Sequence, residues 1–502
     1  MEKVVEMIGI TKIFPGTIAN DNVNFDLNKG ETHVLLGENG AGKTTLMNIL
    51  YGLYQPEKGI IKINGKETKI SSPNDAIKSG IGMVHQHFML VENFSIAENI
   101  ILGNEPKKGM KLDMKKARKE VDEIAKKYGF NINPDDIVED ISVGQQQKVE
   151  ILKALYRGAD VLILDEPTAV LTPQEIEELG VIIKNLKSEG KSVILITHKL
   201  KEVMNMSDRV TIVRRGKVTG VVNTKDTSID ELAELMVGRK VNLVVEKKEM
   251  KIGGAVLVIK DVCASDHRGI EVLKDINLTV YEGEILGVAG VDGNGQSELI
   301  EVLSGLRKAK SGSIDLKGKS IYGLTPREIN DVGMGHIPED RHKRGLVLNE
   351  NLYENAVLGK HYKSEFSGKV MMNYKNIKAH CEKLVKEFDV RTPNIDVLAS
   401  SLSGGNQQKL IVAREISKDP ELLIASQPTR GLDVGAIEYI HGRLVEERDK
   451  GKAVLLVSLE LDEILSLADR IAVMYDGEIV DILDRKDANE QKLGILMAGG
   501  RI

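Results

Sequence analysis

Long hydrophobic runs, cysteines and an excess of positive charge are all scarce in this sequence. No apolar run approaches the roughly 18 residues of a membrane-spanning helix, and we see no signal peptide, so we expect a cytosolic protein. The two cysteines, Cys263 and Cys381, lie far apart without metal-ligand spacing, which favours structural or incidental thiols in a reducing compartment. The formal net charge of −6 disfavours a nucleic-acid partner, which usually selects a basic face.

The bulk composition is that of a globular protein with more than one domain. A chain of 502 residues is too long for one ordinary core, and 41% hydrophobic with 29% charged residues excludes a disordered or fibrous chain. Residues 107–127 are locally basic. Because acidic residues recur three and four positions from the lysines, this segment predicts a solvated helix with charge pairs.

The sequence contains an internal repeat. Residues 23–37 read VNFDLNKGETHVLLG, and residues 276–290 read INLTVYEGEILGVAG. The matched pairs, in chain order, are Gly37 with Gly290, Gln86 with Glu339, Ser142 with Ser403, Asp165 with Ser426, and His198 with Leu459. The first two pairs are 253 positions apart and the last three 261, so the second half carries about eight extra residues. This register indicates a duplication.

Each half predicts an α/β fold with a parallel sheet. Apolar runs such as 32–36, 161–164 and 193–196, with 285–288 and 453–457 in the second half, are rich in β-branched residues and lack polar alternation. Such runs are typical of central parallel strands that are covered on both faces. The stretches after Pro106 and Gly359 are helix-rich and predict a helical subdomain in each half. We therefore expect domains at 1–239 and 255–502, joined by a short linker at 240–254.

A phosphate-binding loop follows the first of these strands. Residues 37–44, GENGAGKT, fit the pattern G-x-x-x-x-G-K-[ST] and lie before a helix that is expected to start near Lys43. Glycines allow the backbone N–H groups to point at phosphate oxygens, and the helix N-terminus adds partial positive charge. Lys43 is expected to reach the β- and γ-phosphates of a nucleotide, and Thr44 to offer its hydroxyl to Mg²⁺.

Two carboxylates and a histidine end the later strands of the first half. Asp165 and Glu166 follow the strand 161–164, and His198 follows 193–196. Downstream of a phosphate loop, Asp165 is expected to hold Mg²⁺ and Glu166 to act as the general base on water. His198 is a candidate sensor of the γ-phosphate, although a histidine at a strand end is also compatible with a purely structural role.

A serine followed by glycine precedes a helix in each half. The segments are SVGQQQ at 142–147 and LSGGNQQ at 402–408. Such a start offers a hydroxyl and free N–H groups to an anion, and an ordinary serine N-cap is the alternative. Each serine lies 23 residues before the carboxylate position of its half, which favours anion binding over capping alone.

Taken together, these motifs resemble the nucleotide-binding domain of ABC transporters, twice, over nearly the whole chain. The resemblance implies two tandem P-loop NTPase domains, each a RecA-like sheet core with a helical subdomain, and it implies the cofactors ATP and Mg²⁺. It assigns catalysis to Glu166, His198 and Gln86, and Mg²⁺ to Thr44, Gln86 and Asp165. The implied ATP contacts are Phe14 (an aromatic platform for adenine, with a core role as its alternative), Gly37, Glu38, Asn39, Gly40, Ala41, Gly42, Lys43, Thr44, Thr45, Ser403, Gly404, Gly405 and Gln407.

In this family two such domains close head to tail, so the resemblance implies two composite ATP sites. The first combines the intact loop and carboxylates of the first half with Ser403, Gly404, Gly405 and Asp433 of the second. In the second, the lysine, both carboxylates, the histidine, one signature glycine and the aspartate that matches Asp433 are replaced. Its members would be Gln296, Ser297, Glu339, Ser426, Gln427 and Leu459, with Ser142, Val143, Gly144 and Thr172 from the first half. Since the defects collect in one composite site, we expect one site that hydrolyses ATP and one that does not.

The tandem arrangement resembles the ATPase subunits of simple-sugar and nucleoside importers. The segments HQHFMLVENFSIAENIILGNEP, DEPTAVLTPQE and SQPTRGLDVGAIEYIH favour the nucleoside branch, with a simple sugar of the ribose, galactose or xylose type as the alternative. The resemblance implies a peripheral protein at the cytoplasmic face of the cell membrane, with permease subunits and an extracytoplasmic solute-binding protein as partners and no nucleic acid. A ribosome-associated tandem ABC ATPase is the less favoured alternative, because those proteins usually carry a long basic linker and two competent sites.

The segment after Gln86 predicts a contact with the permease. Phe88, Met89, Leu90 and Phe94 gather large apolar side chains where the family receives a permease helix. The alternative is a local core under the helical subdomain.

Overall fold

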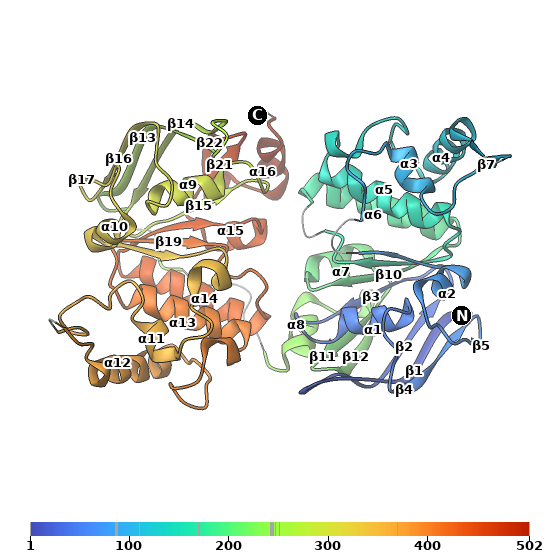
Figure 1. The fold of residues 1–502 in the computed structure, drawn as a ribbon, viewed down its shortest axis with the longest axis horizontal. Coiled ribbons are helices and arrows are strands. Elements are labelled where there is room, and N and C mark those ends of the chain that lie inside the picture. The colour runs from blue at the N-terminus through green and yellow to red at the C-terminus, as the bar shows by residue number, and fades with distance from the viewer. Residues whose placement is uncertain are drawn as a thin grey trace. The chain divides into compact units, whose positions relative to one another are not determined.

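The computed structural model describes residues 2–85, 89–109, 111–168, 171–240, 245, 247–249, 252–368 and 370–500. It divides the chain into two compact units, Met1–Val241 and Asn242–Ile502, which are called the first and the second unit below. Figure 1 shows two sheets and a set of helices in each unit.

The first unit contains an antiparallel sheet and a mainly parallel sheet. In its described residues the antiparallel sheet has the order β2-β1-β4-β5 and the larger sheet the order β12-β11-β3-β10-β9-β6, with only β12 antiparallel to its neighbour. The strands are β1 (Lys3–Phe14), β2 (Thr17–Asn28), β3 (Thr32–Leu36), β4 (Lys58–Ile63), β5 (Lys66–Glu67), β6 (Ile81–Val84), β9 (Val161–Asp165), β10 (Ser192–Thr197), β11 (Arg209–Arg214) and β12 (Lys217–Asn223). A small hairpin joins β7 (Lys107–Lys108) to β8 (Lys111–Leu112).

The helices of the first unit form two groups. The first group lies with the sheets: α1 (Lys43–Leu50), α2 (Pro73–Lys78), α6 (Pro173–Ser188), α7 (Leu200–Met206) and α8 (Ile229–Val237). The second group forms the predicted helical subdomain: α3 (Ile96–Ile101), α4 (Met114–Tyr128) and α5 (Val143–Tyr156). Reciprocal capping boxes start α3 at Ser95, α5 at Ser142 and α6 at Thr172, so local sequence fixes where these helices begin.

The second unit repeats this plan. Its sheets have the orders β14-β13-β16-β17 and β18-β19-β20-β15-β21-β22, with only β22 antiparallel in the larger sheet of the described residues. The strands are β13 (Ala255–Ser265), β14 (Glu271–Tyr281), β15 (Ile285–Ala289), β16 (Ser311–Leu316), β17 (Lys319–Ser320), β18 (Met334–Ile337), β19 (Leu422–Ser426), β20 (Ala453–Val457), β21 (Arg470–Tyr475) and β22 (Glu478–Asp484). The helices are α9 (Gln296–Leu303), α10 (Pro326–Val332), α11 (Leu352–Ala356), α12 (Tyr374–Glu387), α13 (Gly404–Ile416), α14 (Val434–Asp449), α15 (Leu461–Leu467) and α16 (Glu490–Met497).

Apolar layers hold each parallel sheet on both faces. In the first unit one core packs α1 between the antiparallel sheet and one face of β3, β9 and β10, with Leu46, Met47 and Ile194 fully buried (Figure 1). In the second unit α9 takes the same place, and α13 and α14 cover the opposite face of the sheet. All residues of β3, β9, β10, β15, β19 and β20 are buried. The predicted α/β class with two tandem domains is confirmed.

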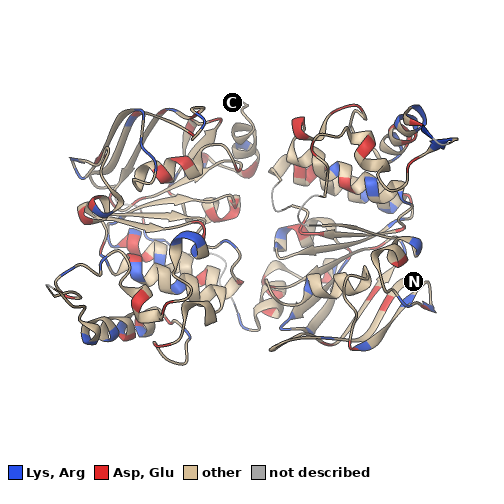
Figure 2. Ribbon diagram, in the orientation of Figure 1, with Lys and Arg blue, Asp and Glu red and all other residues tan. Residues whose placement is uncertain are grey.

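Charge is confined to the surroundings of these cores. Figure 2 shows the central strands of both parallel sheets almost without charged residues, whereas Lys, Arg, Asp and Glu alternate along the helices. On α4, ion pairs join Lys116 to Glu120 and Lys126 to Asp122 four positions apart. The predicted charge-paired helix therefore lies within residues 107–127, but the β7–β8 hairpin precedes it.

Two residues of the predicted linker contact α14 and the end of α15. Lys247 Nζ donates to the carbonyl oxygens of Leu467 and Ala468, and Arg448 donates to the carbonyl oxygen of Lys248. Residues 241–244, 246, 250 and 251 lie outside the described residues. Within the described part of the chain, no helix has both the length and the apolar composition needed to cross a bilayer.

Candidate functional site

The phosphate loop of the first unit depends on glycine at three positions. Gly40 and Gly42 have φ of 78° and 101°, which side chains other than glycine rarely adopt. A Cβ on Gly42 would lie 2.2 Å from the Ala19 carbonyl oxygen, and one on Gly37 would lie 2.3 Å from the Val213 carbonyl oxygen. The loop thus passes directly over neighbouring backbone, and α1 starts where it ends.

Lys43, the first residue of α1, turns back over this loop. Its ammonium group donates to the carbonyl oxygens of Gly37 at 2.7 Å and Glu38 at 2.9 Å, and only 5% of the residue is exposed. Burial lowers the pKa of Lys43, while the charges of Glu166 and Asp165 oppose that shift. The loop therefore contains a buried positive charge facing two carboxylates, a setting that favours a polyanion with a metal ion.

Asp165 lies at the end of β9, within reach of the loop. Its Oδ1 accepts a hydrogen bond from the Thr44 hydroxyl at 3.4 Å. Burial first, and then the charge of Glu166, raise the pKa of Asp165 to about 6. A hydroxyl and a carboxylate that approach each other in this way are oxygen ligands of the kind Mg²⁺ selects.

Glu166 is held by both its backbone and its side chain. It has a φ of 46°, and its N–H donates to the Ile196 carbonyl oxygen on β10 at 3.0 Å. Its Oε1 lies 3.1 Å from Nδ1 of His198. This hydrogen bond is the largest cause that lowers the pKa of Glu166, so the group is ionised at neutral pH. The structure thus brings together four residues that the sequence predicted for one site: Thr44, Asp165, Glu166 and His198.

Two supporting residues were not predicted. The buried carboxylate of Glu202 accepts hydrogen bonds from the hydroxyls of Thr168 and Thr197, which lie close to the ends of β9 and β10. Asn20 is fully buried under the loop and donates to the Gly42 carbonyl oxygen at 3.1 Å. Neither residue gave a signal in the sequence, because Asn20 begins a polar run of three residues and Glu202 lies among other charged residues.

The second unit keeps the loop but not its charge. Gly295 has a φ of 106°, and the amide of Gln296 donates to the Val291 carbonyl oxygen at 3.1 Å where the first unit has the lysine. The hydroxyl of Ser297 donates to Glu339 at 3.2 Å, and Arg430 pairs with the same carboxylate at 2.7 Å. In the second unit the loop hydroxyl therefore meets an internal ion pair whose carboxylate stands at the position that matches Gln86.

The end of β19 in the second unit has the same backbone conformation as the end of β9, but the two acidic residues are replaced. Gln427 has the same φ of 46° as Glu166, and its N–H donates to the Val457 carbonyl oxygen at 2.8 Å. Ser426 stands at the position of Asp165, and the Leu459 N–H donates to Gln427 Oε1 at 3.3 Å where the first unit has the His198 ring. At the positions that match Asp165, Glu166 and His198, the second unit thus has neither a carboxylate nor an imidazole that could accept a proton from water.

The two predicted signature segments both start helices, but they are capped differently. Ser142 Oγ accepts from the Gln145 N–H and forms a capping box at the start of α5. Ser403 precedes α13 without capping it, and its exposed Oγ accepts from the Asn406 side chain at 2.9 Å. Gln407 is buried, and its amide contacts the Ala399 carbonyl oxygen and His342. Its predicted nucleotide contact remains a prediction.

The remaining predicted contacts surround the loop. Phe14 ends β1 and is half-buried against Tyr54, in an edge-to-face contact with ring centroids 5.5 Å apart, and it belongs to none of the described core clusters. Asn39 and Gly40 are exposed, whereas Ala41 is buried; Glu38 and Thr45 are intermediate. Gln86 lies outside the described residues, so its predicted roles stay predictions.

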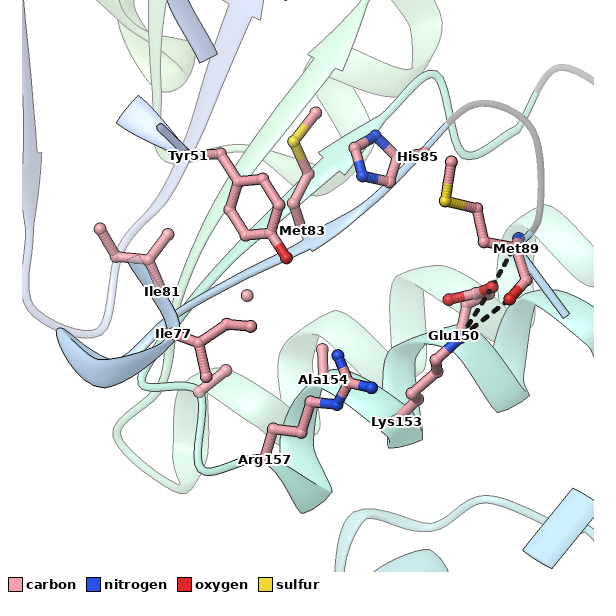
Figure 3. Close-up of a pocket in the computed structure, with 12 residues that line it drawn as sticks. Tyr51, Ile77, Ile81, Met83, His85, Met89, Glu150, Lys153, Ala154 and Arg157 are labelled. Atoms are coloured by element: carbon pink, nitrogen blue, oxygen red, sulfur yellow. Dashed lines mark hydrogen bonds and ion pairs between the residues drawn. The ribbon is translucent and has the colours of Figure 1, made fainter. Parts of the chain in front are cut away.

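A cavity of about 110 Å³ lies beside this site, next to the segment after Gln86. Figure 3 shows Tyr51, Met83 and His85 on one side and the α5 residues Glu150 and Lys153 on the other. Glu150 accepts from the Met89 N–H at 2.8 Å, and Lys153 Nζ donates to the Met89 carbonyl oxygen at 2.9 Å. These bonds fix the Met89 backbone and leave the residue 67% exposed.

The profile of the family described as ABC transporter matches residues 20–169 and 273–430. This chain belongs to the ABC transporter family. The two matches fall one in each unit and include both phosphate loops and both signature segments. The family binds ATP, so the loop that ends at Lys43 belongs to an ABC nucleotide-binding domain.

Individual ABC relatives align over nearly the whole chain. The guanosine import ATP-binding protein NupO of Bacillus subtilis (strain 168) is 57% identical, with 99% of this chain and 98% of that protein covered. The nucleoside import ATP-binding protein NupA of Lactococcus lactis subsp. cremoris (strain MG1363) is 56% identical, with 100% and 99% covered. The glucose import ATP-binding protein TsgD13 of Haloferax volcanii is 45% identical, with 99% and 96% covered.

Among solved structures, a complex of the archaeal ribosomal stalk protein aP1 and the ribosome recycling factor aABCE1 covers 95% of this chain and 90% of its own. The TM-score is 0.61 at 18% identity, which shows a shared fold alone.

The raised pKa of Asp165 predicts a stabilising substitution. Because the folded chain binds this proton more tightly than the unfolded chain, the free energy of unfolding falls as pH rises from about 4 to about 6 and stays lowered above. Asp165→Asn removes the buried charge and should raise the free energy of unfolding of the first unit at pH 7 by about 2 kcal/mol, without nucleotide and Mg²⁺. Denaturant titrations between pH 4 and pH 8 measure this, and the gain should vanish below pH 4.

The matched change in the second unit is the control. Ser426→Asp places a carboxylate in the buried position at the end of β19 and should destabilise that unit at pH 7. If Asp165→Asn left stability unchanged across the pH range, the described environment of Asp165 would be wrong.

Proposed function

We propose that this chain hydrolyses ATP to drive nucleoside import through a separate membrane permease, from the cytoplasmic face of the membrane. The observation that carries the proposal is the complete set of Lys43, Thr44, Asp165, Glu166 and His198 in one unit of a tandem ABC chain. Support for the nucleoside comes from relatives of 57% and 56% identity that are named for guanosine and nucleoside import.

The residues present fit Mg²⁺ together with a nucleotide. Thr44 and Asp165, with Gln86 from the segment that is not described, would hold the ion, because their oxygen donors suit a hard cation. When bound, Mg²⁺ supplies positive charge that offsets the charge on the phosphate oxygens. Lys43 and the loop N–H groups bind the phosphates, and Phe14 offers its ring to the base.

Glu166 is placed to orient water for attack on the terminal phosphate. Its carboxylate is ionised and fixed by His198 at 3.1 Å, so it can accept a hydrogen bond and then a proton from that water. His198 keeps the carboxylate in place and offers its other ring nitrogen to the phosphate. Ser403, Gly404 and Gly405 complete this site from the second unit in the head-to-tail arrangement of the family.

The second nucleotide site is proposed to be catalytically silent. Its loop lacks the lysine, its strand ends lack both acids, and Arg430 already neutralises Glu339. Such a site can support the assembly of the two units without contributing to turnover.

The transported solute is chosen by the permease and the solute-binding protein. A sugar is the second candidate, since TsgD13 is named for glucose import at 45% identity. Guanosine presented by the binding protein should stimulate ATPase activity of the assembled transporter in vesicles, and ribose or glucose should not. Stimulation by a sugar alone would assign the chain to sugar import. Co-purification with ribosomal particles in place of membrane proteins would contradict a role in transport altogether.

The composite site predicts opposite sensitivities for the two signature serines. Ser403→Ala should reduce ATP hydrolysis by the assembled transporter about 100-fold, approaching the loss expected for Lys43→Ala, because it removes a hydroxyl that faces the terminal phosphate. Ser142→Ala should be tolerated, although Ser142 shares its unit with every catalytic group, because it faces the silent site.

Steady-state rates of both variants decide between two arrangements. If each unit worked alone, Ser142→Ala would be the more damaging change. The loss of the Ser142 capping box should appear as reduced stability of α5, so thermal unfolding of both variants separates catalytic from structural effects.

We also propose that the surface around Met89, Leu90 and Phe94 receives a permease helix; Phe88, predicted for the same contact, lies outside the described residues. The exposure of Met89 beside a cavity, with Leu90 and Phe94 only half-buried, supports a docking surface over a local core. Met89→Cys, in a chain with Cys263 and Cys381 replaced, should cross-link to cysteines on the cytoplasmic loops of the permease. Lys66→Cys, exposed at the start of β5, is the control that should not. Failure of Met89 and its neighbours at several positions would contradict this surface.

A further inference from the structure

The starts of the two signature helices have different charged groups beside them. At α5 of the first unit, the carboxylate of Glu175 lies over the helix N-terminus, with Oε1 3.5 Å from Ser142 Oγ. A Cβ on Gly144 would lie 2.1 Å from the same oxygen. Glu175 also closes the capping box of α6 with Thr172, so its position is fixed from two sides. A negative charge therefore already occupies the place where an anion would meet α5.

At α13 of the second unit, the neighbouring charged groups include a cation. Ala436 stands at the position that matches Glu175, and the acidic group on this side is Asp433, whose Oδ2 would lie 3.3 Å from a Cβ on Gly405. The guanidinium of Arg341 lies beside Gly404, because a Cβ on Gly404 would be 3.1 Å from its Nη2, and one on Gly431 would be 3.8 Å from it. Arg341 opens a short helical turn, Arg341–Gly345, which follows Glu339 and the capping residue Asp340.

The guanidinium of Arg341 is held in place, but not all of its N–H groups have a hydrogen-bond acceptor among the described residues. Nη1 donates to the Arg430 carbonyl oxygen at 3.0 Å, and Nε is buried without a hydrogen-bond partner in the part of the chain that the structure describes. The turn that carries it is fixed by Asp340, which accepts from the N–H groups of His342 and Lys343, and by the contact of His342 with Gln407 on α13.

The position of Arg341 disfavours its charged form. Burial lowers the pKa of Arg341 while the charge of Asp340 opposes that shift, and the N-terminus of α13 adds partial positive charge beside the guanidinium. A cation, uncapped helix N–H groups and the exposed Ser403 hydroxyl then converge on the same spot, and all of them are satisfied together by an anion with several oxygen atoms.

We propose that Arg341 binds the terminal phosphate of the ATP held by the phosphate loop of the first unit, next to Ser403, Gly404 and Gly405. The inference rests on the proposed function, to which it adds a specificity-determining residue and no chemical step. Arg341 makes the site prefer ATP over ADP. Phe88 stands at the matching position of the first half, so the silent site receives no such cation and faces Glu175 instead.

The test compares the affinities for ATP and ADP in the assembled transporter, with Glu166→Gln in every protein to prevent turnover. Arg341→Ala should weaken ATP binding on the order of 10- to 100-fold and leave ADP binding unchanged, because only ATP carries the contacted phosphate. Arg341→Lys, which keeps the charge, should recover part of the affinity for ATP. Lys343→Ala is the matched control, since Lys343 is an exposed cation in the same turn, and it should bind both nucleotides as the parent does.

A purely structural role gives a different result. If Arg341 only tied the turn to the Arg430 carbonyl oxygen, Arg341→Ala would weaken ATP and ADP binding equally or would weaken neither, and both results overturn the inference. Arg341→Gln, whose amide can still donate to that carbonyl oxygen, replaces the alanine variant if the latter unfolds.

Ser403→Ala separates this inference from the proposed function. If Ser403→Ala abolishes hydrolysis while the Arg341 variants bind ATP normally, only the role of Arg341 is wrong. If neither position affects ATP binding or hydrolysis, the composite site itself is wrong.

Discussion

The apolar packing of five parallel strands in each unit determines where chemistry can occur. Strands such as β3, β9 and β10 are buried along their whole length, so charged side chains have a place only where the strands end. Because parallel strands end at the same edge, the phosphate loop, Asp165, Glu166 and His198 meet there although they are far apart in sequence. The site follows from the sheet, and the sheet follows from its apolar residues.

The second unit shows that this architecture survives the loss of its chemistry. The glycine before α9 has a φ of 106° against 101° in the first unit, and Gln427 has the same φ as Glu166. Glu463 accepts a hydrogen bond from Thr429, as Glu202 does from Thr168. Backbone geometry is therefore conserved between the units, whereas the charged groups are exchanged. Selective replacement of charges, with the scaffold kept, is what an asymmetric pair of nucleotide sites requires.

Local sequence was sufficient to predict the elements and most of the working site. The strands, the start of α1 at Lys43 and the grouping of Thr44, Asp165 and His198 followed from apolar runs and from motif spacing. Residues that act across long sequence distances could not be predicted in this way. Asn20 under the loop, Glu175 over α5 and Arg341 beside Gly404 depend on the tertiary approach of separate segments, which no local pattern reveals. The ion pair of Arg430 with Glu339 belongs to the same class.

The central claim is that the end of β9 takes part in ATP hydrolysis and the matching end of β19 does not. The most direct measurement compares ATP hydrolysis by the assembled transporter with Glu166→Gln and with Gln427→Ala, two positions that share their backbone conformation. The account predicts a loss of at least about 100-fold for Glu166→Gln, because the general base is removed, and an unchanged rate for Gln427→Ala. A comparable loss in both variants would contradict it, since both strand ends would then take part in turnover.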